Sequence, residues 1–193
     1  MHPANFDYHR ANSIDEAESL YKANADASFL AGGHSLIPAM KLRLAEPGTL
    51  VDIAGIDDLK GITRDGDTIR IGALTTHAEV ENSDVVNDAC TALAEAAGMI
   101  GDPQVRNRGT IGGNVAHADP ASDYPGILMA LGATIVTSGR SIAVDDFFTG
   151  LFETALDEGE MIKEIQVPAL GDGSGAAYAK FFNPASRYAV VGV

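Results

Sequence analysis

Two short segments of the chain pair consecutive glycines with hydrogen-bonding side chains. The first glycine segment consists of Ala31, Gly32, Gly33, His34 and Ser35, and the second consists of Thr110, Ile111, Gly112, Gly113 and Asn114. Adjacent glycines let backbone amides approach one point without a Cβ in the way, so each segment could bind an anion. One such pair is usually a tight turn, whereas two pairs with polar followers favour a diphosphate site.

The second glycine segment lies inside residues 102–123, a stretch rich in polar residues that we interpret as a loop built for binding. Asp119 and Asp123 follow the glycines. A carboxylate is the usual partner of ribose hydroxyls because it accepts two hydrogen bonds at once. Alternatively, either aspartate could cap a helix expected to begin near Tyr124.

Other chemistries have weaker support in the sequence. His34 and Ser35 partly match a serine nucleophile elbow, but isoleucine stands at position 37 where the sharp turn needs glycine. His117 and Asp119 could be two metal ligands, yet no third ligand has a suitable spacing. The usual Rossmann and P-loop glycine signatures are absent. We therefore expect no catalytic residue and no metal site.

The composition of the chain makes several kinds of binding partner unfavourable. The 193 residues include 27 Asp and Glu against 13 Lys and Arg, a net charge of −14, which disfavours nucleic acid. Arg106 and Arg108 could therefore neutralise phosphate, fix the loop or face a partner subunit. A lone cysteine, Cys90, excludes an internal disulfide and a cysteine-built cluster. With no leader and no membrane-length apolar run, we expect a cytoplasmic protein without an integral membrane segment.

The elements that must position the first glycine segment form a small βα unit over residues 1–55. Its expected elements are a helix over 13–23, a strand over 28–31, a helix over 36–44 with Ser35 as N-cap, and a strand over 49–53. A helix between two strands allows the strands to pair in parallel.

Residues 56–176 predict a larger, antiparallel architecture around the second glycine segment. Its expected elements are a hairpin over 62–71, one long helix from 76 to 100, a helix over 124–131, a hairpin over 134–144 and a strand over 161–167. A glycine-rich linker at 171–175 follows. The fold class is therefore α+β.

The two glycine segments, in this order and with Leu50–Ile53 and Pro184–Val193 around them, resemble the FAD-binding medium subunit of molybdenum hydroxylases. This is the family of carbon monoxide dehydrogenase and xanthine dehydrogenase. The resemblance implies a two-subdomain FAD-binding fold, with a small parallel subdomain at 1–55 and a larger antiparallel one at 56–176. It also implies that residues 177–193 begin a C-terminal domain that is largely absent here.

The resemblance further implies the site residues. In the family both glycine segments supply amides and side chains to the FAD diphosphate. Asp123, nine residues beyond Asn114, is similar to the aspartate that holds the adenosine ribose. Tyr188 is similar to an aromatic residue near the isoalloxazine ring.

The implied activity is electron transfer within an oxidoreductase complex. The family's medium subunit takes electrons from an iron–sulfur small subunit and passes them through FAD to an acceptor. A large molybdopterin-binding subunit oxidises the substrate, and the assembly is a dimer of heterotrimers, a heterohexamer. Two alternatives remain open: a stand-alone FAD-dependent oxidoreductase, and a non-catalytic binding or assembly module of the same fold.

Overall fold

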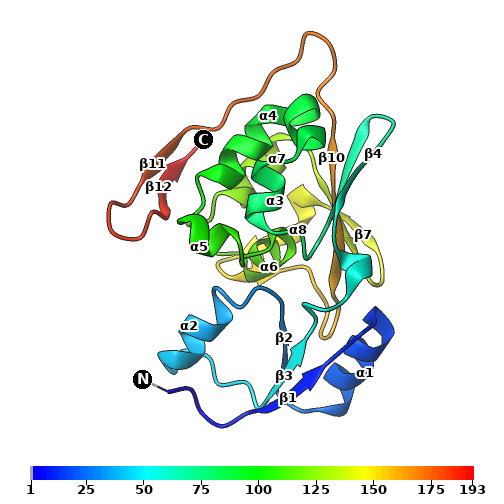
Figure 1. Cartoon of the computed structure of the whole chain (residues 1–193), viewed down its shortest axis with the longest axis vertical. Helices are drawn as coiled ribbons and strands as arrows, with labels where there is room; N and C mark the ends of the chain where they lie inside the picture. Colours follow the sequence, from blue (N-terminus) through cyan, green and yellow to red (C-terminus); the bar gives the residue numbers. More distant parts are fainter. Residues whose placement is uncertain (1) are drawn as a thin grey trace.

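The computed structural model describes residues 2–193, which build two sheets of different construction (Figure 1). In Figure 1 the small sheet lies at the bottom, and the larger sheet lies at the right of the upper body with helices packed to its left. A two-stranded ribbon, formed by β11 (Lys180–Phe182) and β12 (Ala189–Gly192), lies on the far side of those helices.

The small sheet is parallel and has the strand order β1-β3-β2. Its elements are β1 (Asp7–Arg10), α1 (Ile14–Ala23), β2 (Ala27–Leu30), α2 (Leu36–Lys41) and β3 (Thr49–Asp52). The central strand β3 is nearly buried, whereas all four residues of β1 are exposed. Because β1 has no apolar alternation, the sequence does not predict it, and only its pairing with β3 defines it as a strand.

The helix after the first glycine segment begins at Leu36, as predicted, but ends earlier than predicted. It ends at Lys41 rather than at Leu44, because Arg43 adopts a left-handed conformation with φ of 62°. Ser35 occupies the predicted N-cap position, but its side chain does not cap the helix. Ser35 already has helical backbone angles, and its hydroxyl makes no capping hydrogen bond, whereas a capping residue normally has an extended backbone.

The larger sheet is antiparallel, with the strand order β4-β5-β10-β6-β7. Its strands are β4 (Ile62–Asp65), β5 (Thr68–Gly72), β6 (Thr134–Thr137), β7 (Ser141–Ala143) and β10 (Ile162–Pro168). Both expected hairpins are present, and β10 joins them at the centre of the sheet. The fold thus combines a small parallel and a larger antiparallel sheet, as the α+β prediction requires.

Helices cover the larger sheet and bury the main core against it. They are α3 (His77–Glu81), α4 (Asp84–Gly98), α5 (Pro103–Arg106), α6 (Ile111–His117), α7 (Tyr124–Ala130) and α8 (Val144–Phe147). The remaining elements are a 3-10 turn, η1 (Asp57–Leu59), and a short hairpin of β8 (Phe148–Gly150) and β9 (Glu153–Thr154). The cluster of fully buried side chains includes Ile69, Leu93 and Ile165, so strands and helices share one core.

The prediction of one long helix from residue 76 to 100 is wrong. Two helices occupy this stretch, because the chain leaves the helix after Glu81 and restarts with Ser83 as the N-cap of α4. The Ser83 hydroxyl accepts a hydrogen bond from the Val86 amide, which satisfies a donor at the new helix start. The first helix begins with a complete capping box between Thr76 and Glu79, as its sequence pattern indicates.

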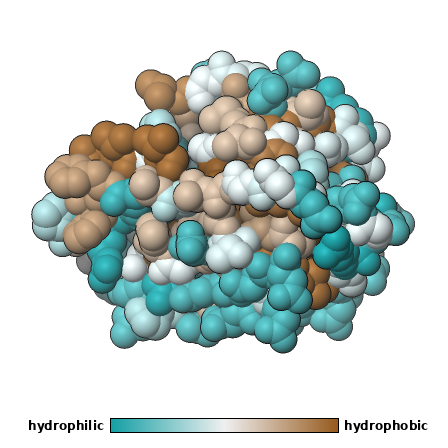
Figure 2. Space-filling view, turned by 90° about the horizontal axis from the view of Figure 1, so that it is seen from above, coloured by the Kyte–Doolittle hydropathy of each residue, from teal (hydrophilic) through white to brown (hydrophobic). Residues whose placement is uncertain are grey.

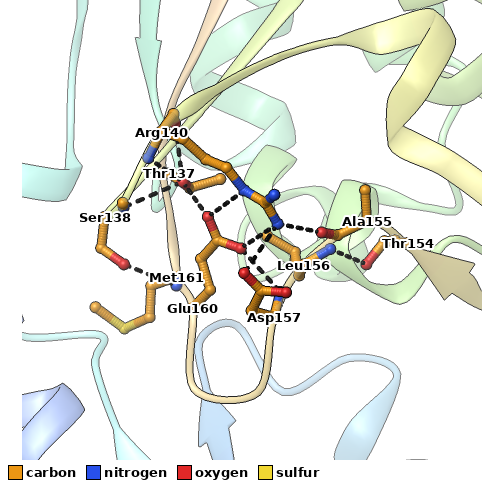
Figure 3. Close-up of polar contacts among 10 residues, drawn as sticks. Thr137, Ser138, Arg140, Thr154, Ala155, Leu156, Asp157, Glu160 and Met161 are labelled. Atoms are coloured by element: carbon orange, nitrogen blue, oxygen red, sulfur yellow. Dashed lines mark hydrogen bonds and ion pairs between the residues drawn. The ribbon is translucent and has the colours of Figure 1, made fainter.

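The loop between β9 and β10 connects the two sheets. Met161 at its end belongs to the small sheet's core, with Val51 and Ala17, while the following residues enter β10. Figure 3 shows Arg140 holding this loop: its guanidinium donates to the Ala155 carbonyl (2.6 Å) and to Glu160 (3.0 Å).

Burial opposes ionisation of Glu160, but hydrogen bonds from Arg140, the Asp157 amide and Thr137 outweigh it and hold the pKa of the Glu160 carboxyl below its usual value. The loop that joins the two sheets is therefore held by a charged network rather than by apolar packing alone.

The β11–β12 ribbon carries an exposed apolar surface. In Figure 2 brown side chains gather at the left, the side on which Figure 1 draws this ribbon. Phe181, Val190, Val191 and Val193 are each more than half exposed. Among the helices of residues 2–193, none is both long and apolar enough to cross a membrane.

Candidate functional site

A cavity of about 630 Å³ lies where the two sheets meet, a size typical of small-molecule and cofactor sites. Every residue of the first glycine segment lines it. From the second glycine segment, Thr110, Gly112, Gly113 and Asn114 line it as well. The structure thus brings together two segments that are separated in the sequence by 74 residues, 36–109.

The stretch at 102–123 is not the loop that its composition indicates. It contains α5 and α6, each started by a polar cap: Asp102 accepts from the Val105 amide, and Thr110 accepts from the Gly113 amide. The glycines of the second segment therefore lie in the first turn of α6. The polar residues near these glycines therefore include helix caps as well as residues that line the cavity.

The two glycine segments touch directly. A Cβ on Gly32 would overlap the Arg108 carbonyl oxygen, and a Cβ on Gly113 would lie 3.8 Å from that of Ala31. Gly32 is therefore required for close approach, because any side chain there would push the segments apart. This contact places both segments on one wall of the cavity.

The first glycine segment leaves its backbone donors available. Within residues 2–193, the amides of Gly32, Gly33, His34 and Ser35 have no hydrogen-bond acceptor. Gly33 has a φ of 74°, a conformation that turns successive amides toward one side and that glycine adopts without strain. Four consecutive unbonded amides that line a cavity can bind an anion.

The second glycine segment uses its backbone donors within the fold. The amides of Ile111 and Gly112 donate to the carbonyls of Thr75 (3.0 Å) and Ala73 (2.9 Å). The Gly113 amide donates to Thr110 Oγ1 at 3.2 Å. What this segment offers the cavity is therefore its shape and the side chain of Asn114, whose Oδ1 already accepts a hydrogen bond from Ser122.

His34 and Ser35 place polar side chains at the cavity in addition to their amides. The His34 ring is exposed, and its Nδ1 lies 3.3 Å from the Gly32 carbonyl oxygen. Ser35 is half-buried, and its hydroxyl is not used as a helix cap. Both side chains can therefore contact a bound molecule.

Asp123 lines the cavity from a buried position. Its carboxylate accepts one hydrogen bond from the Tyr178 hydroxyl (2.8 Å) and one from Lys180 Nζ (2.9 Å). The side chains of Asp123 and Lys180 are only 5% and 3% exposed, so this is a buried ion pair. Neither Asp123 nor Asp119 caps α7, because no side chain provides a hydrogen bond there and Asp119 instead accepts from Ala121.

Lys180 and Tyr178 are partners of Asp123 that no sequence motif predicts. The available signal was their alternation: positions 178 and 180 share one face of an extended segment, while Phe181 points to the other. A lysine on the same face as a buried tyrosine indicates a buried anionic partner.

Tyr188 lies at the rim of the cavity and is 44% exposed. Partial burial and the nearby carboxylates of Asp119 and Asp123 raise the pKa of its phenol. The neighbouring Arg187, also at the rim, stacks over the Phe182 ring at 5.7 Å. The segment that joins β11 to β12 therefore supplies one edge of the cavity.

His77 is a further residue that lines the cavity. It is 3% exposed, and its Nδ1 lies 3.2 Å from the hydroxyl of the fully buried Tyr124. Burial, together with the electrostatic influence of the nearby His34 and Arg106, lowers the pKa of His77 to about 4. The imidazole is therefore neutral at pH 7. In residues 2–193, no three His, Cys, Asp or Glu side chains are grouped so that they could hold a metal ion.

Comparison with known protein families identifies the kind of site. Residues 4–170 match the family described as the FAD binding domain in molybdopterin dehydrogenase. The chain belongs to this family. Membership confirms the resemblance, the α+β fold class, FAD as the family's cofactor and the class of the protein, a flavin-binding subunit of molybdenum hydroxylase oxidoreductases.

Individual members of the FAD-binding family are close in sequence and structure. The carbon monoxide dehydrogenase medium chain of Hydrogenophaga pseudoflava is 45% identical over 100% of this chain and 69% of that protein. The glyceraldehyde dehydrogenase medium chain of Sulfolobus acidocaldarius is 41% identical over 100% of this chain and 70% of its own length. The chain thus spans about two thirds of such relatives.

Solved structures agree with this placement in the FAD-binding family. Carbon monoxide dehydrogenase from Hydrogenophaga pseudoflava, in a form that lacks the Mo-pyranopterin moiety of its cofactor, superimposes with a TM-score of 0.96, covering 100% of this chain and 69% of that chain at 45% identity. Quinoline 2-oxidoreductase from Pseudomonas putida 86 superimposes with a TM-score of 0.92, covering 100% and 68% at 30% identity.

Proposed function

We propose that the cavity binds FAD and that the chain is the electron-transfer subunit of a molybdenum-containing dehydrogenase complex. The observation that carries this proposal is the row of four consecutive amides, Gly32 to Ser35, that line the cavity without acceptors in residues 2–193. When bound, FAD would supply the redox chemistry, while the protein positions it and tunes its potential.

The diphosphate of FAD fits the first glycine segment. The chain carries a net charge of −14, so neutral amide donors suit a dianion here better than scarce lysines do. We assign diphosphate contacts to both segments. In the first, Ala31, Gly32, Gly33, His34 and Ser35 would donate amides and polar side chains. In the second, Thr110, Ile111, Gly112, Gly113 and Asn114 would supply the adjoining surface of the same wall.

The ribose of the adenosine half is assigned to Asp123. Each of its two carboxylate oxygens accepts one hydrogen bond, from Tyr178 or from Lys180, and a carboxylate has about four acceptor positions. Capacity therefore remains for a ribose hydroxyl. Tyr188, at the rim of the same cavity, would lie beside the isoalloxazine ring.

Membership of the FAD-binding family supports a proposal for the electron path. We propose that the chain receives electrons from an iron–sulfur small subunit and passes them through FAD to an acceptor. The substrate would be oxidised on a molybdopterin-binding large subunit, in a dimer of heterotrimers. The 45% identity to a protein named as a carbon monoxide dehydrogenase medium chain supports this assignment of a subunit role.

Two alternatives make different predictions. A stand-alone FAD-dependent oxidoreductase would reduce its flavin with substrate in the absence of other subunits. A non-catalytic module would lack FAD in the assembled complex. Two intact glycine segments, the first of which has unbonded amides, favour FAD binding over the second alternative.

FAD titration of the purified chain tests the proposal, with quenching of flavin fluorescence as the readout. Gly113→Val should abolish binding, because the new side chain would extend between Thr110 Oγ1 and Ala31. Gly171→Val is the matched control, since a Cβ there has no neighbour within 4 Å and the site is remote from the cavity lining. Equal FAD affinity in both variants would contradict the proposed diphosphate position.

A further inference from the structure

We propose that His77 is a binding residue for the diphosphate, donating a hydrogen bond from Nε2 to a phosphate oxygen. This inference rests on the proposed function, because it assigns a further contact in the same cavity. His77 lies outside both glycine segments, on α3. Its position is set by its own amide, which donates to the Gly109 carbonyl at 3.0 Å.

The Nε2 atom lies where the two glycine segments meet. A Cβ on Gly109 would be 2.6 Å from Nε2, and a Cβ on Gly32 would be 3.1 Å from Gly109 Cα. Gly109, Gly32 and His77 all line the cavity. The absence of a side chain on Gly109 thus gives the imidazole access to the space beside the unbonded amides.

Nε2 has no hydrogen-bond partner in residues 2–193, although the side chain is 97% removed from solvent. In the same part of the chain, the one side-chain nitrogen or oxygen that is both fully enclosed and unbonded is Arg70 Nε. Nε2 therefore keeps accessible surface, and that surface faces the cavity that His77 lines. A buried polar atom that faces a cavity without a partner is ready for a ligand.

The Tyr124 hydroxyl decides which imidazole nitrogen carries the proton. Tyr124 is fully buried, and burial, with the nearby Asp123 and Glu81 carboxylates, raises the pKa of its phenol, so the hydroxyl stays protonated. Its partner is His77 Nδ1, at 3.2 Å. The Tyr124 hydroxyl has no other acceptor for its proton in residues 2–193, so it donates to Nδ1, and the ring proton of the neutral imidazole is then on Nε2.

The result is a neutral N–H donor held at the cavity wall. Its ring is fixed by the Tyr124 hydrogen bond and by tilted packing against that phenol, with ring centroids 5.3 Å apart. Phosphate oxygens are acceptors, and a hydrogen bond to an ionised acceptor is stronger than one between neutral groups. His77 therefore extends the row of amide donors with a side chain from a third part of the sequence.

The test compares three variants of the full chain for binding of FAD and of ADP, which shares the diphosphate but lacks the flavin. His77→Phe removes the donor and keeps a ring, so both ligands should bind about 10- to 100-fold more weakly. His77→Gln keeps an N–H near the Nε2 position and should restore most of the affinity. His9→Phe, on the exposed strand β1, should bind like the unaltered chain.

A second measurement does not depend on the stability of any variant. In the unaltered chain with ¹⁵N-labelled histidine, the spectrum should show His77 with its proton on Nε2, and ADP should shift that signal while His9 is unchanged. Unaltered binding of both ligands by His77→Phe would overturn the inference, as would weakening for FAD alone or the absence of an ADP-induced shift.

These outcomes separate the inference from the proposed function. If His77→Phe binds FAD normally, the His77 contact is wrong and the FAD site stands. If the unaltered chain binds ADP but not FAD, the proposed cofactor is wrong, and the ADP titrations still decide the His77 contact. If neither ligand binds, both proposals fail.

Discussion

The two glycine segments have similar sequences but play opposite parts in the fold. The first, 31–35, leaves four amides without acceptors in the described residues, and Ser35 caps nothing. The second, 110–114, gives its amides to the carbonyls of Ala73 and Thr75 and to its own Thr110 cap. A glycine pair with polar neighbours therefore indicates that the backbone approaches another group closely. The pattern does not show whether that group is a ligand or another part of the chain.

The difference arises from what each segment packs against. The start of α6 packs against the residues that follow β5, and the carbonyls of Ala73 and Thr75 accept hydrogen bonds from its amides. A Cβ on Gly112 would lie only 2.7 Å from the Ala73 oxygen. The first segment leaves β2 at the edge of the cavity, where the amides of residues 32–35 meet no acceptor in the described residues. We infer that the first segment is specialised for a ligand and the second for holding the wall in place.

The largest expected effect on stability concerns Asp123, which follows the second glycine segment and forms a buried ion pair with Lys180. Asp123→Ala leaves the buried Lys180 ammonium unpaired and should lower the free energy of unfolding by about 3–5 kcal/mol. Urea denaturation of the FAD-free chain measures this. Asp119→Ala, which removes a turn contact with Ala121, is the control and should cost about 1 kcal/mol. Equal losses would mean that the ion pair is not structural.

The next largest effect is a pH dependence of stability that arises from His77, which lies beside the point where the two glycine segments meet. The pKa of His77 falls from 6.5 to about 4 on folding, so between these values the unfolded chain binds a proton that the folded chain does not. Stability should therefore decrease as pH falls from 6.5 to 4, by up to about 3 kcal/mol from this residue.

Denaturation curves at several pH values, recorded for the unaltered chain and for His77→Phe, isolate this contribution as the difference between the two slopes. His9→Phe, which changes an exposed histidine on β1, is the control and should keep the unaltered slope. Parallel slopes for the unaltered chain and His77→Phe would show that His77 is not buried in its neutral form.

A smaller effect compares the hydroxyls of the two residues at N-cap positions, Thr110 before α6 and Ser35 before α2. Thr110→Ala removes the acceptor of the Gly113 amide and should destabilise the chain by about 1–2 kcal/mol. Ser35→Ala removes a hydroxyl that caps nothing, so the change should stay within about 0.5 kcal/mol. Thermal or urea unfolding decides, and a reversed order would contradict the division of roles between the segments.

Amide hydrogen exchange compares the two glycine segments directly in the unaltered chain. Amide hydrogen exchange should be fast at residues 32–35 and slow at Gly112, whose amide is buried and bonded. On addition of FAD, protection should rise at 32–35 and stay constant at Gly112. Protection that increased equally in both segments would show that the second segment also gives its amides to the ligand.

Much of the fold could be predicted from local patterns. Each hairpin has a turn signal between alternating strands, and the capping box at Thr76 and Glu79 marks a helix start correctly. The break at Ser83 was missed because apolar spacing continues through it, and spacing alone does not show where a new cap begins. The strand β1 was missed because it is exposed on both faces and is defined only by β3.

By itself, the sequence determined the two architectures, the family and the two glycine segments, because turn residues, apolar periodicity and short motifs are local properties. Tertiary structure alone decided which amides remain unbonded, because a donor's availability depends on whether a distant carbonyl reaches it. It also decided that Lys180 meets Asp123 and that His77 faces the cavity beside Gly109. These contacts join residues far apart in the chain, and only the packing of the two sheets brings them together.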